Sequence, residues 1–372
     1  MMSNIPVGIS DILRALREGG YQAYLVGGCV RDRLLGFTPG DYDICTSALP
    51  EEMKTCFGEG FRTYDSGIKH GTLTVLRGET SAEVTTFRLD GGYTDGRHPD
   101  AVSFTRELAE DLSRRDFTVN AMALSSDGQI VDLFGGRADL AAGVIRAVGE
   151  PAVRFHEDAL RILRALRFAS RLGFEIEDKT SRALHECAHL LSRVSRERIA
   201  TELFGIVMGK GAAEIVDEYA DVLTCAGIVP APIDNALPFD RIIRMAALLR
   251  GDREGACSLK LSNKFRDEIT DLIDNYDTVL PTDESSALYL MNRIGYEGAL
   301  RLCRLRGDAG EAVISAKKGG KPYTVGALAV NGSHLMQAGY SGKELGQTLE
   351  RVLHAIMDGE LTNRKDEILK WI

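Results

Sequence analysis

The sequence predicts an α+β protein whose strands gather in the first 149 residues and whose remainder is helical. Short runs rich in Val, Ile, Thr and Tyr and bounded by Gly, Asp and Ser crowd the first part, and apolar residues recur with a 3.6-residue period after Pro151. The chain has 372 residues, 44% hydrophobic and 27% charged, which is ordinary for a globular protein. We therefore expect a mixed strand-and-helix domain followed by helical domains.

The strand-like runs come first along the chain and the long helical patterns follow. We expect strands over 21–28, 41–47, 71–78, 81–88 and 144–149. The helical period predicts helices over 157–174, 181–194, 196–208, 239–250, 265–276 and 345–359. Glycine-rich breaks at 149–151, 209–211 and 317–324 separate these blocks.

Charge and cysteine content limit the compartment and the partners. No early apolar run resembles a signal peptide, and no later window reaches the ~18 apolar residues of a membrane span. Seven cysteines without a CxxC pair favour reduced thiols, so we expect a cytoplasmic protein with no membrane partner. The net charge is −9, but 151–210 and 301–372 are each +3, which permits an RNA partner.

A glycine pair follows the first expected strand. Gly27 and Gly28 stand directly before a helical run that carries Arg31. Glycines let the backbone approach a ligand closely, and a strand-to-helix turn of this kind suits a phosphate. An ordinary turn is the alternative.

Two aspartates follow, one residue apart. Within a strand, Asp41 and Asp43 would point to one face and repel each other unless a cation lay between them. Two carboxylates beside a glycine turn suit metal-assisted nucleotidyl transfer. Glu83 could complete the site, or all three acids could be exposed edge-strand charges.

Adjacent arginines occur in EDLSRRDFTVNAMAL, residues 110–124. A guanidinium such as that of Arg115 is a natural phosphate partner, although such a run is also common on solvated surfaces. The polar, glycine-rich stretch DGGYTDGRHPDAVSF (90–104) just before it suggests a mobile loop beside a site.

A polar stripe marks RFHEDALRILRALRF, residues 154–168. Asp158, Arg161, Arg164 and Arg167 recur every three residues along one side of the expected helix. A carboxylate accepts hydrogen bonds and a guanidinium donates them. Asp158 together with Arg161 could therefore bind the edge of cytosine or adenine, which has an amino donor beside a ring-nitrogen acceptor, and reject uracil or guanine. The alternative is a solvated arginine stripe with a Glu157–Arg161 pair.

One further motif is compatible with zinc chemistry. HECAH, from His185 to His189, matches HExxH, in which both histidines share a helix face and Glu186 could serve as base. No extended metalloprotease pattern follows, so two ordinary helix histidines are the alternative.

Taken together, these motifs resemble the class II tRNA nucleotidyltransferases, the CCA-adding enzymes of the Bacillus type. The resemblance covers nearly the whole chain, from LVGGCVRDRLLGFTPGDYDICTSA through DLSRRDFTVNAMAL, HEDALRILRALRF and SRERIATEL to the tail ending in GELTNRKDEILKWI. It implies a polymerase-β-like nucleotidyltransferase head with a small mixed sheet (1–149), then a helical neck (150–209), body (210–300) and tail (301–372).

The resemblance also implies roles for the residues singled out above. Asp41 and Asp43 would be Mg²⁺ ligands; Gly28, Arg31 and Arg115 would contact the incoming CTP or ATP; Asp158 and Arg161 would read the base; and Arg164 and Arg167 would complete the nucleotide pocket. The body and tail would hold the tRNA acceptor stem and elbow. The oligomeric state stays open, a homodimer being one option.

The expected activity is template-independent addition of C, C and A to the 3′ end of tRNA. An A-adding or CC-adding enzyme of a split pair is the alternative; the YTDGRHP segment resembles the loop needed to switch from C to A, which disfavours CC-only addition. A bacterial poly(A) polymerase and a non-catalytic RNA-binding protein are further alternatives.

Overall fold

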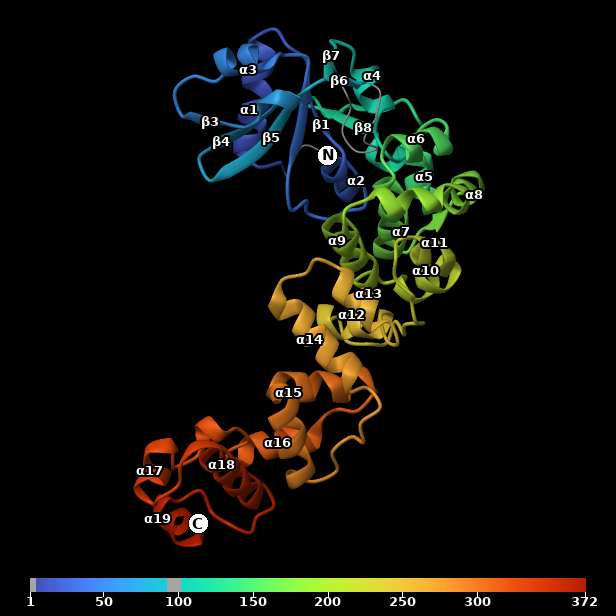
Figure 1. The fold of residues 1–372 in the computed structure, drawn as a ribbon. Coiled ribbons are helices and arrows are strands. Elements are labelled where there is room, and N and C mark those ends of the chain that lie inside the picture. The colour runs from blue at the N-terminus through green and yellow to red at the C-terminus, as the bar shows by residue number, and fades with distance from the viewer. Residues whose placement is uncertain (1–4, 92–101) are drawn as a thin grey trace. The chain divides into compact units, whose positions relative to one another are not determined.

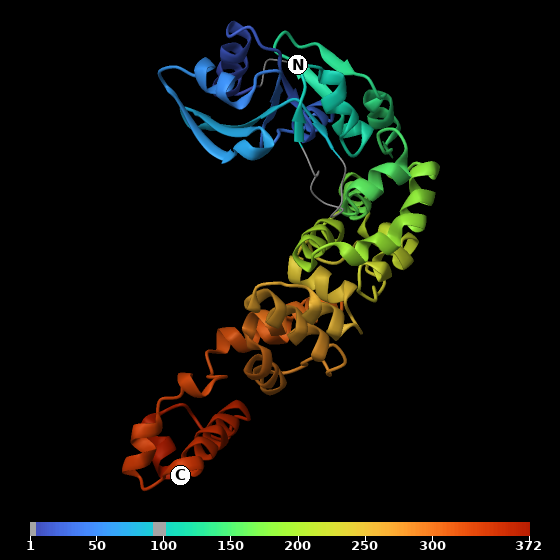
Figure 2. The same ribbon diagram turned by 45° about the horizontal axis from the view of Figure 1, so that its top comes forward.

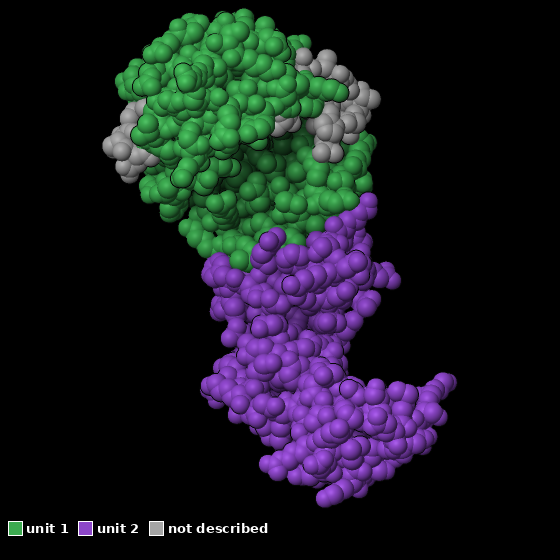
Figure 3. Space-filling view, turned by 90° about the vertical axis from the view of Figure 1, so that its left-hand side faces the viewer, with its two compact units in different colours: residues 1–227 green, residues 228–372 purple. Residues whose placement is uncertain are grey.

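The computed structural model describes residues 5–91 and 102–372 and divides the chain into two compact units. Unit 1 spans residues 1–227 and unit 2 spans 228–372 (Figure 3). Residues 92–101 of the stretch 90–104, over which we expected a mobile loop, lie outside the described residues, and the two ends of this stretch belong to β6 (Arg88–Asp90) and β7 (Val102–Phe104).

Unit 1 contains a mixed sheet with the strand order β3-β4-β5-β2-β1-β8-β9 (Figure 1). Its strands are β1 (Ala23–Val26), β2 (Asp43–Thr46), β3 (Phe61–Gly67), β4 (Thr72–Arg77), β5 (Thr80–Thr86), β8 (Met122–Ser125) and β9 (Ile130–Asp132). β2 and β5 pair in parallel, and the other neighbours pair antiparallel. The expected small mixed sheet is confirmed, whereas β3, β8 and β9 were not predicted.

The two faces of this sheet differ in burial. Ile44, Val75 and Val84 point to one face and are at most 1% exposed, and α1 (Val7–Glu18) packs along β4, β5 and β1. The register of the parallel pair sets Asp43 directly beside Glu83 on the opposite face, where Glu83 is exposed. Alternation therefore brings Asp43 and Glu83 to the same face, which is covered farther along β2, where Cys45 packs with Leu108 and Leu112.

Helices and short strand pairs complete unit 1, and Figures 1 and 2 show them in two views. The helices are α2 (Gly28–Leu34), α3 (Pro50–Cys56), α4 (Leu108–Ser113), α5 (Gly136–Ala142), α6 (Pro151–Glu157), α7 (Leu160–Leu172), α8 (Asp178–Cys187), α9 (Arg196–Val207), α10 (Ala212–Glu218) and α11 (Ala220–Cys225). The strand pairs are β6 (Arg88–Asp90) with β7 (Val102–Phe104), and β10 (Val144–Ile145) with β11 (Glu175–Ile176).

Two local expectations after residue 140 differ from the structure. The strand expected over 144–149 is only the two-residue β10, which pairs with β11, so the region after Pro151 is largely rather than wholly helical. The helix expected over 157–174 is present as α7 but begins later than expected, at Leu160, because α6 ends at Glu157 and a break follows in which Asp158 is extended at φ −141° and ψ 104°. The spacing of apolar residues did not reveal this break, because both α6 and α7 have apolar residues on their buried sides.

Glycines also mark the end of α9. A Cβ at Gly209 would overlap Ser170 of α7, so the absence of a side chain lets the two helices approach closely. The Gly211 amide then donates to the Ser170 carbonyl at 3.0 Å, just before α10 begins. The break expected over 209–211 therefore coincides with a helix boundary.

Unit 2 is helical in its described residues. Its helices are α12 (Arg241–Leu248), α13 (Arg253–Ser258), α14 (Asn263–Asp274), α15 (Glu284–Leu305), α16 (Glu311–Gly319), α17 (Gly332–Gln337), α18 (Gly342–Met357) and α19 (Lys365–Trp371). Gly295 has φ +74° and kinks α15, a conformation that favours glycine. In the described parts of the chain, no helix combines the length and apolar character needed to cross a bilayer.

Candidate active site

Six of the predicted site residues line one pocket of about 320 Å³ in unit 1. They are Gly28, Asp43, Arg115, Asp158, Arg161 and Arg164. The pocket brings together the glycine turn, the first residue of β2, the arginine run after α4, and the residues around the break between α6 and α7. Residues more than 100 positions apart in the sequence therefore face one cavity.

The carboxylates lie where β2 begins. Asp43 is the first residue of β2 and is half-buried, whereas Asp41 is exposed in the bend just before the strand, so the expectation that both lie within the strand was wrong. Burial raises the pKa of Asp43, the negative charges of Asp41 and Glu83 raise it further, and Arg115 opposes them. Asp41 and Glu83 are thus both close enough to Asp43 to influence it electrostatically.

This concentration of negative charge fits a divalent cation. A half-buried carboxylate with two like charges nearby is stabilised by a positive ion, and Mg²⁺ prefers oxygen ligands. Within the described residues, however, no three His, Cys, Asp or Glu side chains are arranged to hold an ion by themselves. Mg²⁺ sites commonly use one or two carboxylates and take their other ligands from phosphates and water, so the pair Asp41 and Asp43 suffices for such a site.

The glycine turn and Arg115 form the adjacent wall. Gly27 has φ +73°, which a residue with a side chain rarely adopts, and Arg115 Nη1 stands 3.3 Å from where a Cβ on Gly27 would be. The Arg115 Nη2 donates to buried Asp111 at 3.1 Å. Burial would raise the pKa of Asp111, but Arg115 and Arg114 lower it, so Asp111 stays ionised and holds Arg115 against the turn.

Asp158 is held at the break between α6 and α7. Its Oδ1 accepts a hydrogen bond from the Leu160 amide at 3.1 Å, and its Oδ2 accepts one from Arg198 Nη2 of α9 at 2.9 Å. Asp is favoured at such a position because its side chain can accept from the first free amides of the following helix. The carboxylate therefore has a defined orientation inside the pocket.

Arg161 is anchored from two directions. Its Nη1 donates to Glu157 at 2.6 Å, and its Nη2 donates to the Arg114 carbonyl at 2.9 Å. The Glu157–Arg161 ion pair, which the sequence analysis gave as the alternative to a base-reading role for Arg161, does form. Arg161 also lines the pocket. The two interpretations of this residue are therefore compatible.

Arg164 joins α7 to Asp116 in the arginine run. Its Nε donates to the Asp116 Oδ2 at 2.8 Å. Burial by itself would raise the pKa of Asp116, but the Arg164 guanidinium and hydrogen bonds from Asn120 and the Phe117 amide lower it from 3.8 to about 2. This ion pair, in which Asp116 is buried and Arg164 is half-buried, fixes the cationic side chain at the pocket wall.

We predict that Asp116→Asn lowers the free energy of unfolding by about 2 kcal/mol near neutral pH. The folded-state pKa is depressed, so the stabilisation is complete above the unfolded value of 3.8 and is lost as pH falls through about 2. Urea unfolding at several pH values should show the difference from wild type shrinking from about pH 4 to about pH 2. Glu79→Gln, at an exposed turn, is the control; an Asp116→Asn deficit that stays constant with pH would contradict the prediction.

Arg31 and Arg167 do not line the pocket, although sequence reasoning assigned both to the nucleotide. Arg31 is 4% exposed and donates to Asp32 and Asn120. Arg167 donates through Nε to Glu202 of α9 at 2.5 Å. Both guanidinium groups lie over the ring of Phe168, which does line the pocket.

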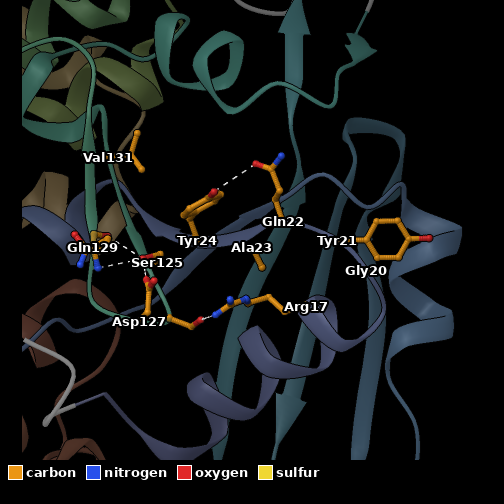
Figure 4. A pocket seen from close by; sticks show the side chains of 11 residues that line it. Arg17, Gly20, Tyr21, Gln22, Ala23, Tyr24, Ser125, Asp127, Gln129 and Val131 are labelled. Carbon is orange, nitrogen blue, oxygen red and sulfur yellow. Dashed lines mark hydrogen bonds between the residues drawn. The ribbon is translucent and has the colours of Figure 1, made fainter.

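Other clusters in unit 1 lie apart from these residues. His185 donates to Asp221 at 2.7 Å and stacks on Tyr219, and His189 donates to the Glu186 carbonyl, so the HECAH histidines have separate partners. A second pocket of about 480 Å³ lies between the end of α1, β1 and the β8–β9 turn (Figure 4). There Arg17 donates to Ser126 and Tyr24 to Gln22, and none of the predicted site residues lines it.

Comparison with known families gives three matches in chain order. Residues 23–146 match the poly A polymerase head domain, 173–223 match a probable RNA and SrmB-binding site of polymerase A, and 323–372 match a putative domain 2 of tRNA nucleotidyltransferase. The first match contains the carboxylates and Arg115. Asp158, Arg161 and Arg164 lie between the first two matches.

Full-length relatives decide the family. The chain is 37% identical to the CCA-adding enzyme of Lactobacillus delbrueckii over 97% of this chain and 96% of that protein, and 36% identical to that of Geobacillus thermodenitrificans over 97% and 95%. The chain belongs to the bacterial CCA-adding enzymes of class II. The fold agrees: the crystal structure of the Bacillus stearothermophilus CCA-adding enzyme in complex with CTP superimposes with a TM-score of 0.84 at 33% identity, covering 98% of this chain and 95% of that one.

Membership of the CCA-adding enzymes confirms the resemblance, the expected CCA addition to the 3′ end of tRNA and the α+β class expected from the sequence. The pocket lining also contains residues that the sequence analysis did not assign to the site: Asp116, Asn120, Leu160, Phe168 and Arg198. All five lie in segments quoted for the resemblance, but nothing in their spacing indicated that they face the same cavity. The domain boundaries at 149, 209 and 300 stay predictions.

Proposed function

We propose that this CCA-adding enzyme adds C, C and A in turn to the 3′ end of tRNA from CTP and ATP, using one pocket for every incoming nucleotide. The observation that carries the proposal is that Asp43 and the base-reading candidates Asp158 and Arg161 line the same cavity of about 320 Å³. This volume suits a single small-molecule ligand. The similar Bacillus stearothermophilus enzyme was crystallised with CTP, which supports a nucleotide as the occupant.

The phosphate end of the nucleotide would lie against the glycine turn. Gly27 and Gly28 leave room for an anion to approach the backbone, and Arg115 Nη1 projects toward the same place. The ion pair with Asp111 keeps the guanidinium oriented before the ligand arrives. The triphosphate would therefore bind a guanidinium that is already oriented, so that less conformational entropy is lost on binding.

The base end would lie against Asp158 and Arg161. Cytosine and adenine each present an amino donor beside a ring-nitrogen acceptor, which match a carboxylate acceptor and a guanidinium donor. Arg198 holds Asp158, and Glu157 with the Arg114 carbonyl holds Arg161. Because these side chains do the reading, selection of C and A needs no nucleic-acid template.

Asp41 and Asp43, with Glu83 beside them, would hold Mg²⁺. The bound ions would supply activation of the attacking hydroxyl and charge stabilisation at the phosphoryl oxygens. In the reaction, the terminal 3′ hydroxyl of tRNA loses its proton and attacks the α-phosphorus, the bond to the bridging oxygen of the β-phosphate breaks, and pyrophosphate leaves. Arg115 and Arg164 would attract the nucleotide and offset its negative charge.

The tRNA would bind through the helical region and unit 2. The match of residues 323–372 to a tRNA nucleotidyltransferase domain supports this role for the tail, as does its +3 charge over 301–372. The acceptor stem and elbow are the parts of tRNA that we expect to be bound.

The test is incorporation of labelled CTP and ATP, separately and together with Mg²⁺, onto tRNA transcripts that end before the CCA tail, after one C and after CC. Ordered addition of C, C and A to the shortest transcript is the expected result. Addition of only A to the CC-ended transcript would instead identify an A-adding partner of a split pair, and addition that stops at CC would identify the CC-adding partner. Long A tails on unrelated RNA would identify a poly(A) polymerase.

A further inference from the structure

The ring of Phe168 in α7 is surrounded by guanidinium groups. The guanidinium carbon of Arg167 lies 4.3 Å from the ring centroid, that of Arg31 at 5.1 Å and that of Arg164 at 5.4 Å. Phe117 packs its ring against the same side chain edge to face, with centroids 5.8 Å apart. Phe168 is only 5% exposed, yet it lines the nucleotide pocket.

Arg164 and Arg167 lie on α7 together with Phe168, Arg31 lies on α2, and each arginine has a different acidic partner. Arg31 of α2 pairs with Asp32, Arg164 with Asp116 and Arg167 with Glu202. The aromatic ring is the one contact in the described structure that all three share. Of the three, only Arg164 lines the pocket directly, so Phe168 connects the other two to the pocket wall.

An aromatic ring suits this position better than a carboxylate would. The ring face attracts a cation through its quadrupole but accepts none of its N–H groups in a strong hydrogen bond. A carboxylate at the same place would add a further negative charge beside the site of the triphosphate, whereas an aliphatic side chain would leave the three guanidinium groups held only by their separate acidic partners. The ring therefore gathers the guanidinium groups and keeps their positive charge available.

We propose that Phe168 is a positioning residue for nucleotide binding, holding Arg31, Arg164 and Arg167 as a preformed cationic wall behind the incoming triphosphate. The proposal rests on the proposed function, because it assumes that a nucleoside triphosphate occupies this pocket. It also gives Arg31 and Arg167 an indirect role, which agrees with their contact with the ring and their absence from the pocket lining.

The experiment measures equilibrium binding of CTP to the full-length protein by calorimetry, together with KM and kcat for CTP incorporation. Phe168→Leu keeps an apolar side chain but removes the ring, and we expect the Kd and KM for CTP to rise roughly tenfold while kcat changes less. Phe155→Leu is the matched control: Phe155 is fully buried in the neighbouring α6, and the described residues give it no guanidinium contact. We expect the thermal unfolding midpoint of Phe155→Leu to fall as much as that of Phe168→Leu, whereas the Kd of Phe155→Leu for CTP should stay at the wild-type value.

A second series separates the ring electrostatics from packing. Phenylalanine at position 168 is replaced by its mono-, di- and trifluorinated forms, which withdraw electron density from the ring face with little change in size. A stepwise rise in the Kd for CTP supports the proposal even if Phe168→Leu does not fold. If the Kd for CTP does not change along the fluorinated series, or if Phe168→Leu binds CTP as wild type does, the role of Phe168 is overturned and the proposed function stands. If the wild-type protein binds no CTP, both the role of Phe168 and the proposed function are overturned.

Discussion

Asp43→Ala is expected to lower incorporation of both CTP and ATP by about 10²- to 10³-fold while tRNA binding persists. Asp43 is the half-buried carboxylate at the start of β2, and it stands on the pocket lining beside the glycine turn. Removing it takes away the negative charge that would hold a cation where charge develops on the transferring phosphate. Affinity for tRNA should not fall, because the change removes an acid from a surface that approaches a polyanion.

The measurements are single-turnover incorporation and a gel-shift titration with tRNA. Asp41→Ala should give a similar loss, and Glu83→Ala a smaller one, because Glu83 lies on the neighbouring strand β5 whereas Asp41 and Asp43 lie two positions apart where β2 begins. Glu79→Ala is the matched control, an exposed acid at the turn that joins the same β4–β5 pair. Full incorporation by Asp43→Ala and Asp41→Ala would refute the assigned catalytic roles.

Arg161→Ala is expected to weaken discrimination between CTP or ATP and the wrong nucleotides UTP and GTP by about 10- to 100-fold. The guanidinium is fixed by Glu157 and the Arg114 carbonyl, so it presents its remaining donors to the pocket in one orientation. Without the guanidinium, the ring-nitrogen acceptor of cytosine or adenine loses its hydrogen-bond donor. The N–H donor of uracil or guanine no longer faces a fixed donor of the protein, so the free-energy cost of binding the wrong base disappears. The tRNA dissociation constant should change much less.

Competition between labelled CTP and an excess of UTP or GTP measures this selectivity directly. Arg171→Ala is a suitable control, because Arg171 lies on the same helix α7 but is exposed and absent from the pocket lining. Arg161→Lys should recover only part of the discrimination, since an ammonium cannot reproduce the planar fork of a guanidinium. If Arg161→Ala discriminates against UTP and GTP as well as wild type does, Arg161 does not read the base. Asp158 would then be the remaining candidate for that role.

The strand and helix patterns predicted the class of the fold but not the pieces that depend on tertiary contacts. β8 and β9 are short and lie at one side of the sheet, and their residues show little alternation of their own. The break at Asp158 was also invisible, because α6 and α7 both carry apolar periodicity and a capping aspartate looks like one more polar residue on a helix. That break matters, since it turns the Asp158 carboxylate toward Arg198.

By itself, the sequence determined which chemistry the chain carries: a glycine turn, paired carboxylates, and an aspartate with arginines at a fixed spacing, in the order found in the CCA-adding enzymes. Local chemistry is encoded in residue type and short spacing, so motifs are enough to recognise it. Only the tertiary structure decided that six of these residues share one pocket, that Arg31 and Arg167 lie behind it, and that Phe168, Asn120 and Arg198 belong to it. The physical reason is that a pocket wall is made by side chains from distant segments, whose proximity depends on strand register and helix packing rather than on local sequence.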